Sequence, residues 1–589
     1  MKKTKTIDIV LKMMYNDNDN YIGGFFMGKI NLKLNEVEKF DSIKDMLNKA
    51  VAACGDKPLY KWRAGKEIKS VSYNEFRKTV DYLGTALSSI GMATKHVATT
   101  GENSYDWICT YLTMLMSEGV FVPVDKEMPI DDMIRVVNNS DSEVIFYASK
   151  FEDIFHEREA EFENIKYFIG FERDEDEGKF LSYKKFLEKG KKLFEEGDRS
   201  YADMQGDQNV LKMLIYTSGT TGDPKGVMLS EHNLCAMIYH GMQVSSISTV
   251  ELAVLPFHHT YEAVPGILVG IHGHATMCIN AKLTQVLKNM QEFKPDYMYI
   301  VPAFAELFYK KIWAAAKEGG KEKGLKILIK VSNFLRKFGI DLRKKFFKTI
   351  HESFGGNLFK LICGGAPVRA ELGEFFESIG IFLMNGYGIS ECSPLIAVNR
   401  REHNDCTTVG FVLPCLEMKL LDVTDEGIGE ICVKGDNVML GYYKRPDLTE
   451  EALKDGWFAT GDYGQLDPEG RLKITGRKKN MIVLTNGKNI YPEELEEQIG
   501  NLDYVKEVVV YAIKDENGQE DALQAEVFLD EDLVKAMNEE NIEARLMKDI
   551  NEIFRDYPRY KQIAKVKIRD KEFVKNSSNK IKRNLIGKE

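Results

Sequence analysis

The sequence predicts an α/β protein with a large N-terminal domain built on parallel-rich sheets and a small antiparallel barrel-like subdomain. A small, mobile α+β domain should follow at the C-terminus. Short apolar runs alternate with helical segments between residues 96 and 385, which is typical of parallel sheets. After residue 417 the runs become shorter and are separated by Gly and Asp, as in antiparallel sheets. The 589 residues also exceed the ~250–300 that one hydrophobic core usually accommodates.

The N-terminal half supplies most of the predicted parallel strands. Amphipathic patterns predict helices over residues 43–53 and 73–90, the second with Ser72 as its N-cap. Residues 96–125 indicate a strand, a helix and a strand, and residues 144–150 indicate another strand. Further buried strands are expected at 211–216, 251–256, 276–280, 297–302, 358–364 and 382–385.

The last section begins near Gly476 and predicts a compact α+β domain of ~110 residues. We expect a helix at PEELEEQIG (492–500), strands around it, and one long helix over residues 533–556. The predicted organisation is a tail over residues 1–36, a large domain over 37–476 and the mobile C-terminal domain over 477–589.

Composition and charge exclude several classes of protein. Hydrophobic content of 44% and charged content of 29% are ordinary for a folded domain. A net charge of −10 argues against a nucleic-acid binder, because phosphate backbones require a positive face. The nine cysteines form no C-x-x-C pair, so we expect reduced, mostly buried thiols in a cytoplasmic protein. Neither a signal peptide nor a run of ~18 apolar residues is found.

The strongest local signal is the loop YTSGTTGDPKG, residues 216–226. Its glycines permit close backbone approach to a ligand, its hydroxyls and N–H groups can donate hydrogen bonds, and Lys225 adds positive charge. These features suit the oxygens of a polyphosphate. The loop is not a Walker A motif, because Pro224 precedes the lysine and Gly226 follows it.

Further motifs follow in a fixed order: PFHHTYE (256–262), GGAP (364–367), NGYGISE (385–391), TGD (460–462), GRKKN (476–480), TNGKNIYPEELE (485–496) and KNSSNKIKR (575–583). With the loop, they resemble the adenylate-forming superfamily of acyl-CoA synthetases, luciferases and peptide-synthetase adenylation domains. The resemblance covers roughly residues 40–589 and is closest to the long-chain fatty-acyl-CoA synthetases.

The resemblance implies a nucleotide site in the large domain. Its phosphate-binding residues would be Thr217, Ser218, Gly219, Thr220, Thr221, Gly222 and Lys225. Its adenine-binding residues would be Gly364, Gly365, Ala366, Asn385, Gly386, Tyr387 and Gly388. Glu391 and Thr217 would bind Mg²⁺, Ser390 would contact the α-phosphate in place of the usual Thr, and His259 would line the acyl pocket.

The C-terminal motifs imply the remaining roles. Asp462 would accept hydrogen bonds from the ribose hydroxyls, and Arg477 would lie near ribose and phosphate. Lys479 stands at the family's hinge position, and Gly487 would allow the CoA arm to pass. Lys580 matches the catalytic lysine, although Asn579 replaces the Gly that often precedes it.

The implied reaction joins a carboxylic acid to ATP as an acyl-adenylate and then transfers the acyl group to CoA. The implied cofactors are therefore ATP, Mg²⁺ and CoA, and the expected partners are small molecules rather than nucleic acid. An acyl carrier protein is an alternative acceptor, because the thiol chemistry is the same. A nucleotide-binding module without catalysis is the third interpretation, although the complete set of motifs counts against it.

Residues 310–348 form a basic segment in an otherwise acidic chain. The segment carries thirteen Lys and Arg against three acidic residues, with apolar residues at near-helical spacing. Such a segment could hold the protein at an anionic membrane surface, where a fatty substrate is found. The alternative is an ordinary solvated helix pair packed on the domain.

Overall fold

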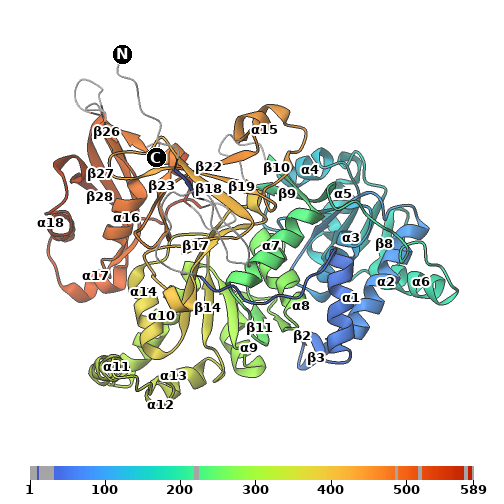
Figure 1. Cartoon of the computed structure of the whole chain (residues 1–589), viewed down its shortest axis with the longest axis horizontal. Helices are drawn as coiled ribbons and strands as arrows, with labels where there is room; N and C mark the ends of the chain where they lie inside the picture. Colours follow the sequence, from blue (N-terminus) through green and yellow to red (C-terminus); the bar gives the residue numbers. More distant parts are fainter. Residues whose placement is uncertain are drawn as a thin grey trace, which may run out of the picture. The chain divides into compact units, whose positions relative to one another are not determined.

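The computed structural model describes residues 9–11, 32–217, 225–484, 488–514, 520–575 and 581–586 (Figure 1). The chain divides into two compact units. The larger unit comprises residues 12–417 and 433–458, and the smaller comprises residues 1–11, 418–432 and 459–589.

An eight-stranded sheet forms one layer of the larger unit. Its strands, in spatial order, are β20 (Gly441–Tyr442), β10 (Lys225–Ser230), β9 (Leu211–Thr217), β5 (Val120–Val124), β4 (His96–Thr100), β6 (Ser142–Tyr147), β7 (Tyr167–Gly170) and β8 (Phe180–Ser182). The strands from β9 to β8 are parallel, whereas β10 is antiparallel to both β9 and β20. The antiparallel edge arises because β10 follows β9 directly in the sequence and pairs with it, with Lys225 opposite Thr217.

A nine-stranded sheet forms a second layer of the same unit. Its strands, in spatial order, are β17 (Phe411–Val412), β16 (Leu395–Val398), β15 (Phe382–Gly388), β14 (Lys360–Cys363), β13 (Tyr297–Ile300), β11 (Val250–Ala253), β12 (Thr276–Ile279), β2 (Pro58–Ala64) and β3 (Glu67–Ser72). The central strands from β15 to β2 are parallel, as expected for strands joined by helices. Nearly all residues of β11, β12, β13 and β14 are buried, in keeping with their mostly apolar sequences.

Most helices of the larger unit flank these two sheets, whereas α11 (Glu322–Arg336) and α12 (Arg343–Phe346) pack against other helices (Figure 1). The other helices of this unit are α1 (Ile43–Cys54), α2 (Tyr73–Ser89), α3 (Tyr105–Leu115), α4 (Ile130–Asn139), α5 (Glu152–Glu157), α6 (Tyr183–Glu195), α7 (Glu231–Val244), α8 (Val269–His272), α9 (Val286–Phe293), α10 (Pro302–Glu318), α13 (Lys348–Ser353), α14 (Ala370–Ile379) and α15 (Pro446–Ala452). Ser72 caps α2 as predicted, and Glu75 completes a capping box with it.

A six-stranded sheet contains the predicted antiparallel strands. Its order is β1 (Ile9–Leu11), β18 (Leu416–Leu421), β19 (Gly429–Gly435), β22 (Trp457–Leu466) and β21 (Leu453–Lys454), and β23 (Leu472–Arg477) also pairs with β22. The pairs β1–β18, β21–β22 and β22–β23 are antiparallel.

The C-terminal region is an α+β fold with its own apolar core. Its strands are β24 (Ile482–Val483), β25 (Asn489–Ile490), β26 (Val505–Lys514), β27 (Glu520–Leu529) and β28 (Ile563–Arg569), and its helices are α16 (Pro492–Gly500), α17 (Glu531–Met537) and α18 (Ile542–Ile553). The sheets confirm the predicted fold: parallel-rich layers, an antiparallel sheet and an α+β region.

The single helix predicted over residues 533–556 is wrong. Two helices, α17 and α18, occupy this stretch. Asn538 adopts a left-handed conformation with φ 49°, which ends the first helix, as Asn often does at such positions. The side chain of Asn541 then accepts a hydrogen bond from the Ala544 N–H and begins the second helix.

All nine cysteines are free thiols and six of them are buried, as predicted. Within the part of the chain that the structure describes, every helix is too short or too polar to cross a bilayer.

Two carboxyl groups are buried together under the nine-stranded sheet. Glu251 on β11 and Glu262, which begins a π-helical segment over Glu262–Leu268, are both fully buried. The Tyr297 hydroxyl donates a hydrogen bond of 3.0 Å to Glu251. Burial raises the pKa of both carboxyls, and the Glu251 charge raises the pKa of Glu262 further. The pair therefore favours protonation in the folded state.

This pair predicts a loss of stability in alkali. Because the folded pKa values exceed the ordinary value of 4.5, the stabilisation is complete below about pH 4.5 and is lost as the pH rises through the raised values. We expect the free energy of unfolding to fall by more than about 1 kcal/mol between pH 6 and pH 9, since one pKa unit corresponds to about 1.4 kcal/mol. Urea unfolding of Glu251→Gln, which stays neutral, should show a smaller fall. The exposed Glu67→Gln should behave as wild type, and equal slopes in all three proteins would contradict the assignment.

Candidate functional site

The predicted phosphate loop joins two paired strands. Thr217 ends β9 and pairs with Lys225, the first residue of β10. The ladder therefore holds both ends of the loop beside each other. The predicted residues Ser218, Gly219, Thr220, Thr221 and Gly222 lie outside the described residues.

Lys225, Tyr442 and Glu391 lie together beside this loop. The Lys225 Nζ lies 5.5 Å from the centroid of the Tyr442 ring. The Tyr442 hydroxyl donates a hydrogen bond of 2.9 Å to Glu391 Oε1. Burial, and next the Glu391 charge, raise the pKa of Tyr442 above its ordinary value, so the hydroxyl stays protonated and donates. The Tyr442 side chain thus has a cation over its ring and a carboxylate at its hydroxyl.

Asn437 and Gly388 shape the turn that carries Ser390 and Glu391. The buried Asn437 amide donates to the carbonyls of Cys392, at 2.8 Å, and Leu395, at 2.7 Å. The Ile389 N–H donates to the Pro394 carbonyl at 2.8 Å. A β carbon on Gly388 would lie 2.2 Å from that same oxygen. The turn therefore requires glycine at position 388.

The PFHHTYE segment reaches the same turn. The Thr260 and Ser390 hydroxyls lie 3.2 Å apart, within hydrogen-bonding distance. His259 is half-buried, and its ring centroid lies 4.2 Å from that of His258. His258 is buried with Nε2 3.4 Å from Asp125 Oδ1, and burial lowers its pKa. His258 is thus held inside the fold, and His259 is the more accessible of the two.

The GGAP segment packs on the same motif. The Tyr261 hydroxyl donates to the Ile362 carbonyl at 2.9 Å, and its ring lies against Gly364. Gly365 has φ 84°, and both Gly365 and Ala366 are exposed. The exposed backbone after β14 could lie along the flat face of a base.

The NGYG residues on β15 differ in their surroundings. Asn385 is buried, and its amide donates to the carbonyls of Cys406, at 2.9 Å, and Thr408, at 3.4 Å. This contact holds the loop before β17. Gly386 and Tyr387 are half-buried and pair with Val398 and Ala397 on β16. The side chain of Asn385 thus has a clear structural role.

The remaining described residues gather in the smaller unit. Asp462 and Arg477 are cross-strand partners on β22 and β23, with Asp462 Oδ1 3.5 Å from Arg477 Nε. Asp462 is buried, and its N–H donates to Thr460 Oγ1 at 3.1 Å. Burial, and then the charge of Arg477, lower the pKa of Lys479. Gly487 and Lys580 lie outside the described residues.

Sequence reasoning missed Tyr442 and Asp125 as residues of this site. It also missed that His258 is buried and faces the Asp125 carboxylate. Tyr442 belongs to the run GYYKRP, and the residue types and spacing of this run do not indicate a binding site. Asp125 follows β5, and polar residues at the carboxyl ends of parallel strands are a usable signal for such sites.

Comparison with known proteins gives two family matches. Residues 47–443 match the family described as AMP-binding enzyme, and residues 479–589 match the family described as AMP-binding enzyme C-terminal domain. The predicted resemblance to the adenylate-forming superfamily is thereby confirmed.

Individual relatives agree with these matches. Long chain acyl-CoA synthetase 4 of Arabidopsis thaliana is 27% identical over 521 residues, covering 81% of this chain and 77% of the relative. Long-chain-fatty-acid–CoA ligase 6 of Rattus norvegicus is 28% identical over 489 residues, covering 77% of this chain and 69% of the relative. The crystal structure of the anthranilate CoA ligase AuaEII with anthranoyl-AMP has a TM-score of 0.73 at 17% identity, covering 93% of this chain and 96% of that one. This last likeness supports the fold alone.

Proposed function

The chain belongs to the AMP-binding enzyme family, and on that premise we propose that it activates a carboxylic acid with ATP and transfers the acyl group to CoA. The observation that carries the proposal is the cluster of Lys225, Tyr442 and Glu391 beside the two ends of the phosphate loop. A carboxylate and a triphosphate both carry negative charge, so their reaction requires positive charge and hydrogen-bond donors at the phosphates. The first products would be acyl-adenylate and pyrophosphate, and the second would be acyl-CoA and AMP.

The residues of the larger unit would divide the binding of ATP among them. Lys225 and the loop would contact the phosphates, and the exposed backbone of Gly365 and Ala366 would lie along the adenine. Ser390 would donate to the α-phosphate while Thr260 orients its hydroxyl at 3.2 Å. His259 would line the acid site. These positions would fix the acid in line with the α-phosphorus and exclude water from the mixed anhydride.

Glu391 fits a magnesium ion, since Mg²⁺ prefers one or two carboxylates together with substrate phosphates. When bound, the ion supplies charge neutralisation at the transferring phosphates. Tyr442 holds one oxygen of Glu391, and a carboxylate accepts several contacts at once, so the hydrogen bond orients the group without exhausting it. The Thr217 hydroxyl is the second proposed ligand.

The smaller unit would complete the site. Asp462 would accept hydrogen bonds from the ribose hydroxyls, and Arg477, which lies beside Asp462, would contact ribose or phosphate. We propose that residues 477–589 form a mobile domain that turns about Lys479. One arrangement would bring Lys580 to the phosphates, and the other would bring Gly487 to the CoA arm.

The acid is proposed to be a long-chain fatty acid. Support comes from relatives whose names specify long-chain acyl-CoA synthesis and which this chain matches over most of its length. A screen of pyrophosphate release against straight-chain acids of increasing length, each with and without CoA, tests this directly. We expect ATP-dependent release that is highest with the long acids and acyl-CoA formation when CoA is added. If pyrophosphate is released but no acyl-CoA forms, and the acyl group is transferred to a holo acyl carrier protein, the acceptor is the carrier protein and not CoA.

Tyr442→Phe should lower the rate of pyrophosphate release about fivefold at limiting Mg²⁺. The variant keeps the ring beside Lys225 and removes only the hydrogen bond to Glu391, a bond to a charged group that is worth ~1.5–3 kcal/mol at most. The loss should diminish at saturating Mg²⁺. Tyr443→Phe, whose hydroxyl bonds Asp141 instead, is the matched control and should keep the wild-type Mg²⁺ dependence. If the rate of pyrophosphate release depended on Mg²⁺ in the same way in both variants, the proposed role of Tyr442 in orienting Glu391 would be contradicted.

A further inference from the structure

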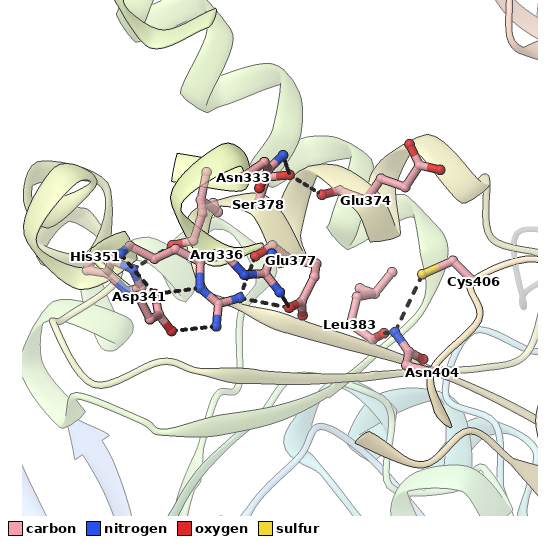
Figure 2. Close-up of polar contacts among 12 residues, drawn as sticks. Asn333, Arg336, Asp341, His351, Glu374, Glu377, Ser378, Leu383, Asn404 and Cys406 are labelled. Carbon is pink, nitrogen blue, oxygen red and sulfur yellow. Dashed lines mark hydrogen bonds and ion pairs between the residues drawn. The ribbon is translucent and has the colours of Figure 1, made fainter. Parts of the chain in front are cut away.

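Helix α11 has an inner face that is firmly attached to α14. Leu325 and Ser332 on this face are buried. Figure 2 shows the polar contacts at this junction: Asn333 Nδ2 donates to Ser378 Oγ at 2.9 Å, and Arg336 pairs with Glu377 at 2.6 Å. These contacts fix the rotation of α11 about its own axis.

The segment after α11 is attached to the same carboxylate. Arg343, which begins α12, donates to Glu377 Oε1 and to the Glu377 carbonyl, both at 2.8 Å. Arg343 also pairs with Asp341 at 2.8 Å. Two guanidinium groups from the two ends of the turn between α11 and α12 therefore meet at one residue of α14. The opposite face of α11 is held outward.

That outer face is apolar and exposed. Ile327, Phe334 and Phe338 are 61%, 60% and 67% exposed, and Val331 is exposed between them. In sequence order these residues are spaced by four, three and four. Ile327, Val331 and Phe334 therefore lie on one side of the helix, and Phe338 lies just beyond its end. Large apolar side chains clustered in water mark an interaction surface.

A row of lysines runs beside these apolar side chains. Lys323, Lys330 and Lys337 are exposed and lie seven residues apart, which repeats the same position on the helix every two turns. The whole chain carries a net charge of −10, so this row is a positively charged patch on a negatively charged protein. We call the stripe of Ile327, Val331, Phe334 and Phe338, together with this row, the α11 face.

We propose that the α11 face docks on an anionic lipid bilayer, with the helix parallel to the membrane plane. The apolar stripe would enter the boundary between headgroups and acyl chains, and the lysines would contact lipid phosphates. Charge complementarity selects this occupant over a second copy of the chain. A two-fold contact between the stripes of two antiparallel α11 helices would bring their two lysine rows against each other at close range. The inference does not depend on the proposed reaction.

Vesicle co-sedimentation of the full chain tests the proposal. We expect binding to vesicles of phosphatidylcholine with 30% phosphatidylglycerol, weakening as salt is raised, and at least tenfold weaker binding to pure phosphatidylcholine. Equal binding to both vesicles, or no binding to either, would overturn it. Light scattering in the absence of lipid identifies self-association, and a dimer that is lost when the stripe is made polar would assign the face to a second copy instead.

Two variants separate the stripe from the row. The stripe variant carries Ile327→Gln, Phe334→Gln and Phe338→Gln, and we expect at least tenfold weaker binding from it. The row variant carries Lys323→Glu, Lys330→Glu and Lys337→Glu, and we expect about 100-fold weaker binding, since each lysine near the surface contributes about 1 kcal/mol.

Matched controls come from elsewhere on the same unit. The apolar control replaces other exposed apolar residues with Gln: Ile68, Val210 and Leu283. The charge control replaces other exposed lysines with Glu: Lys184, Lys189 and Lys282. All four proteins should unfold at the same temperature as wild type within a few degrees, because the changes are on the surface. Controls that bind as weakly as the two variants would overturn the assignment to the α11 face.

Discussion

Replacing Lys580 with Ala should slow acyl-adenylate formation by about 10²–10³-fold and leave thioester formation from supplied acyl-adenylate close to wild type. The physical reason is that a positive charge at the α-phosphate stabilises the transition state of the first step, where charge on pyrophosphate develops. The second step releases AMP and depends on the thiol instead. Exchange of labelled pyrophosphate into ATP measures the first step, and release of AMP on adding CoA to purified acyl-adenylate measures the second.

A neighbouring lysine gives the control for this experiment. Lys582 is exposed and lies two residues away in the same KNSSNKIKR segment, so Lys582→Ala removes the same charge from nearly the same place. Its rates should match wild type. Equal loss of both half-reactions in Lys580→Ala would refute the division of labour, and equal effects of the two substitutions would refute a specific role for Lys580.

Glu391→Gln should lower pyrophosphate release about 100-fold at 1 mM Mg²⁺, with partial recovery as Mg²⁺ is raised. The amide keeps the size of the side chain and an acceptor for Tyr442, but it loses the charge that a hard cation requires. Initial rates across a Mg²⁺ titration measure the effect. We expect a raised half-saturating Mg²⁺ concentration.

The control for Glu391 is Glu402→Gln, an exposed carboxylate eleven residues further along the chain. It should leave the Mg²⁺ curve unchanged. If Glu391→Gln lowered the rate without moving the Mg²⁺ dependence, the carboxylate would act on something other than the cation, and the proposed metal role would fall.

The architecture was predictable because its signals are local. Buried parallel strands such as β9 and β14 are short apolar runs, and Ser72 with Glu75 marks the start of α2 in four residues. The end of α17 was missed because the helical pattern continues through Asn538 and only the left-handed backbone there interrupts it. A residue's backbone conformation is set by its surroundings as much as by its type.

The site was predictable where it consists of contiguous motifs and not where it depends on pairing. Glu391 and Tyr442 are 51 residues apart, and they meet because β20 joins the edge of the sheet beside β10. The sequence of neither segment predicts that β20 pairs with β10. The contact between Thr260 and Ser390 likewise joins residues 130 positions apart. Such contacts are properties of the sheet order, which single-sequence patterns do not specify.

Gly388 sets a limit on how this protein could be redesigned. Directed evolution of the acyl and nucleotide preferences would naturally randomise residues 385–391. Any side chain at position 388 would displace the Pro394 carbonyl and, with it, the backbone that presents Ser390 and Glu391. A library that keeps glycine there and varies Tyr387 should therefore retain far more folded clones than one that varies both positions.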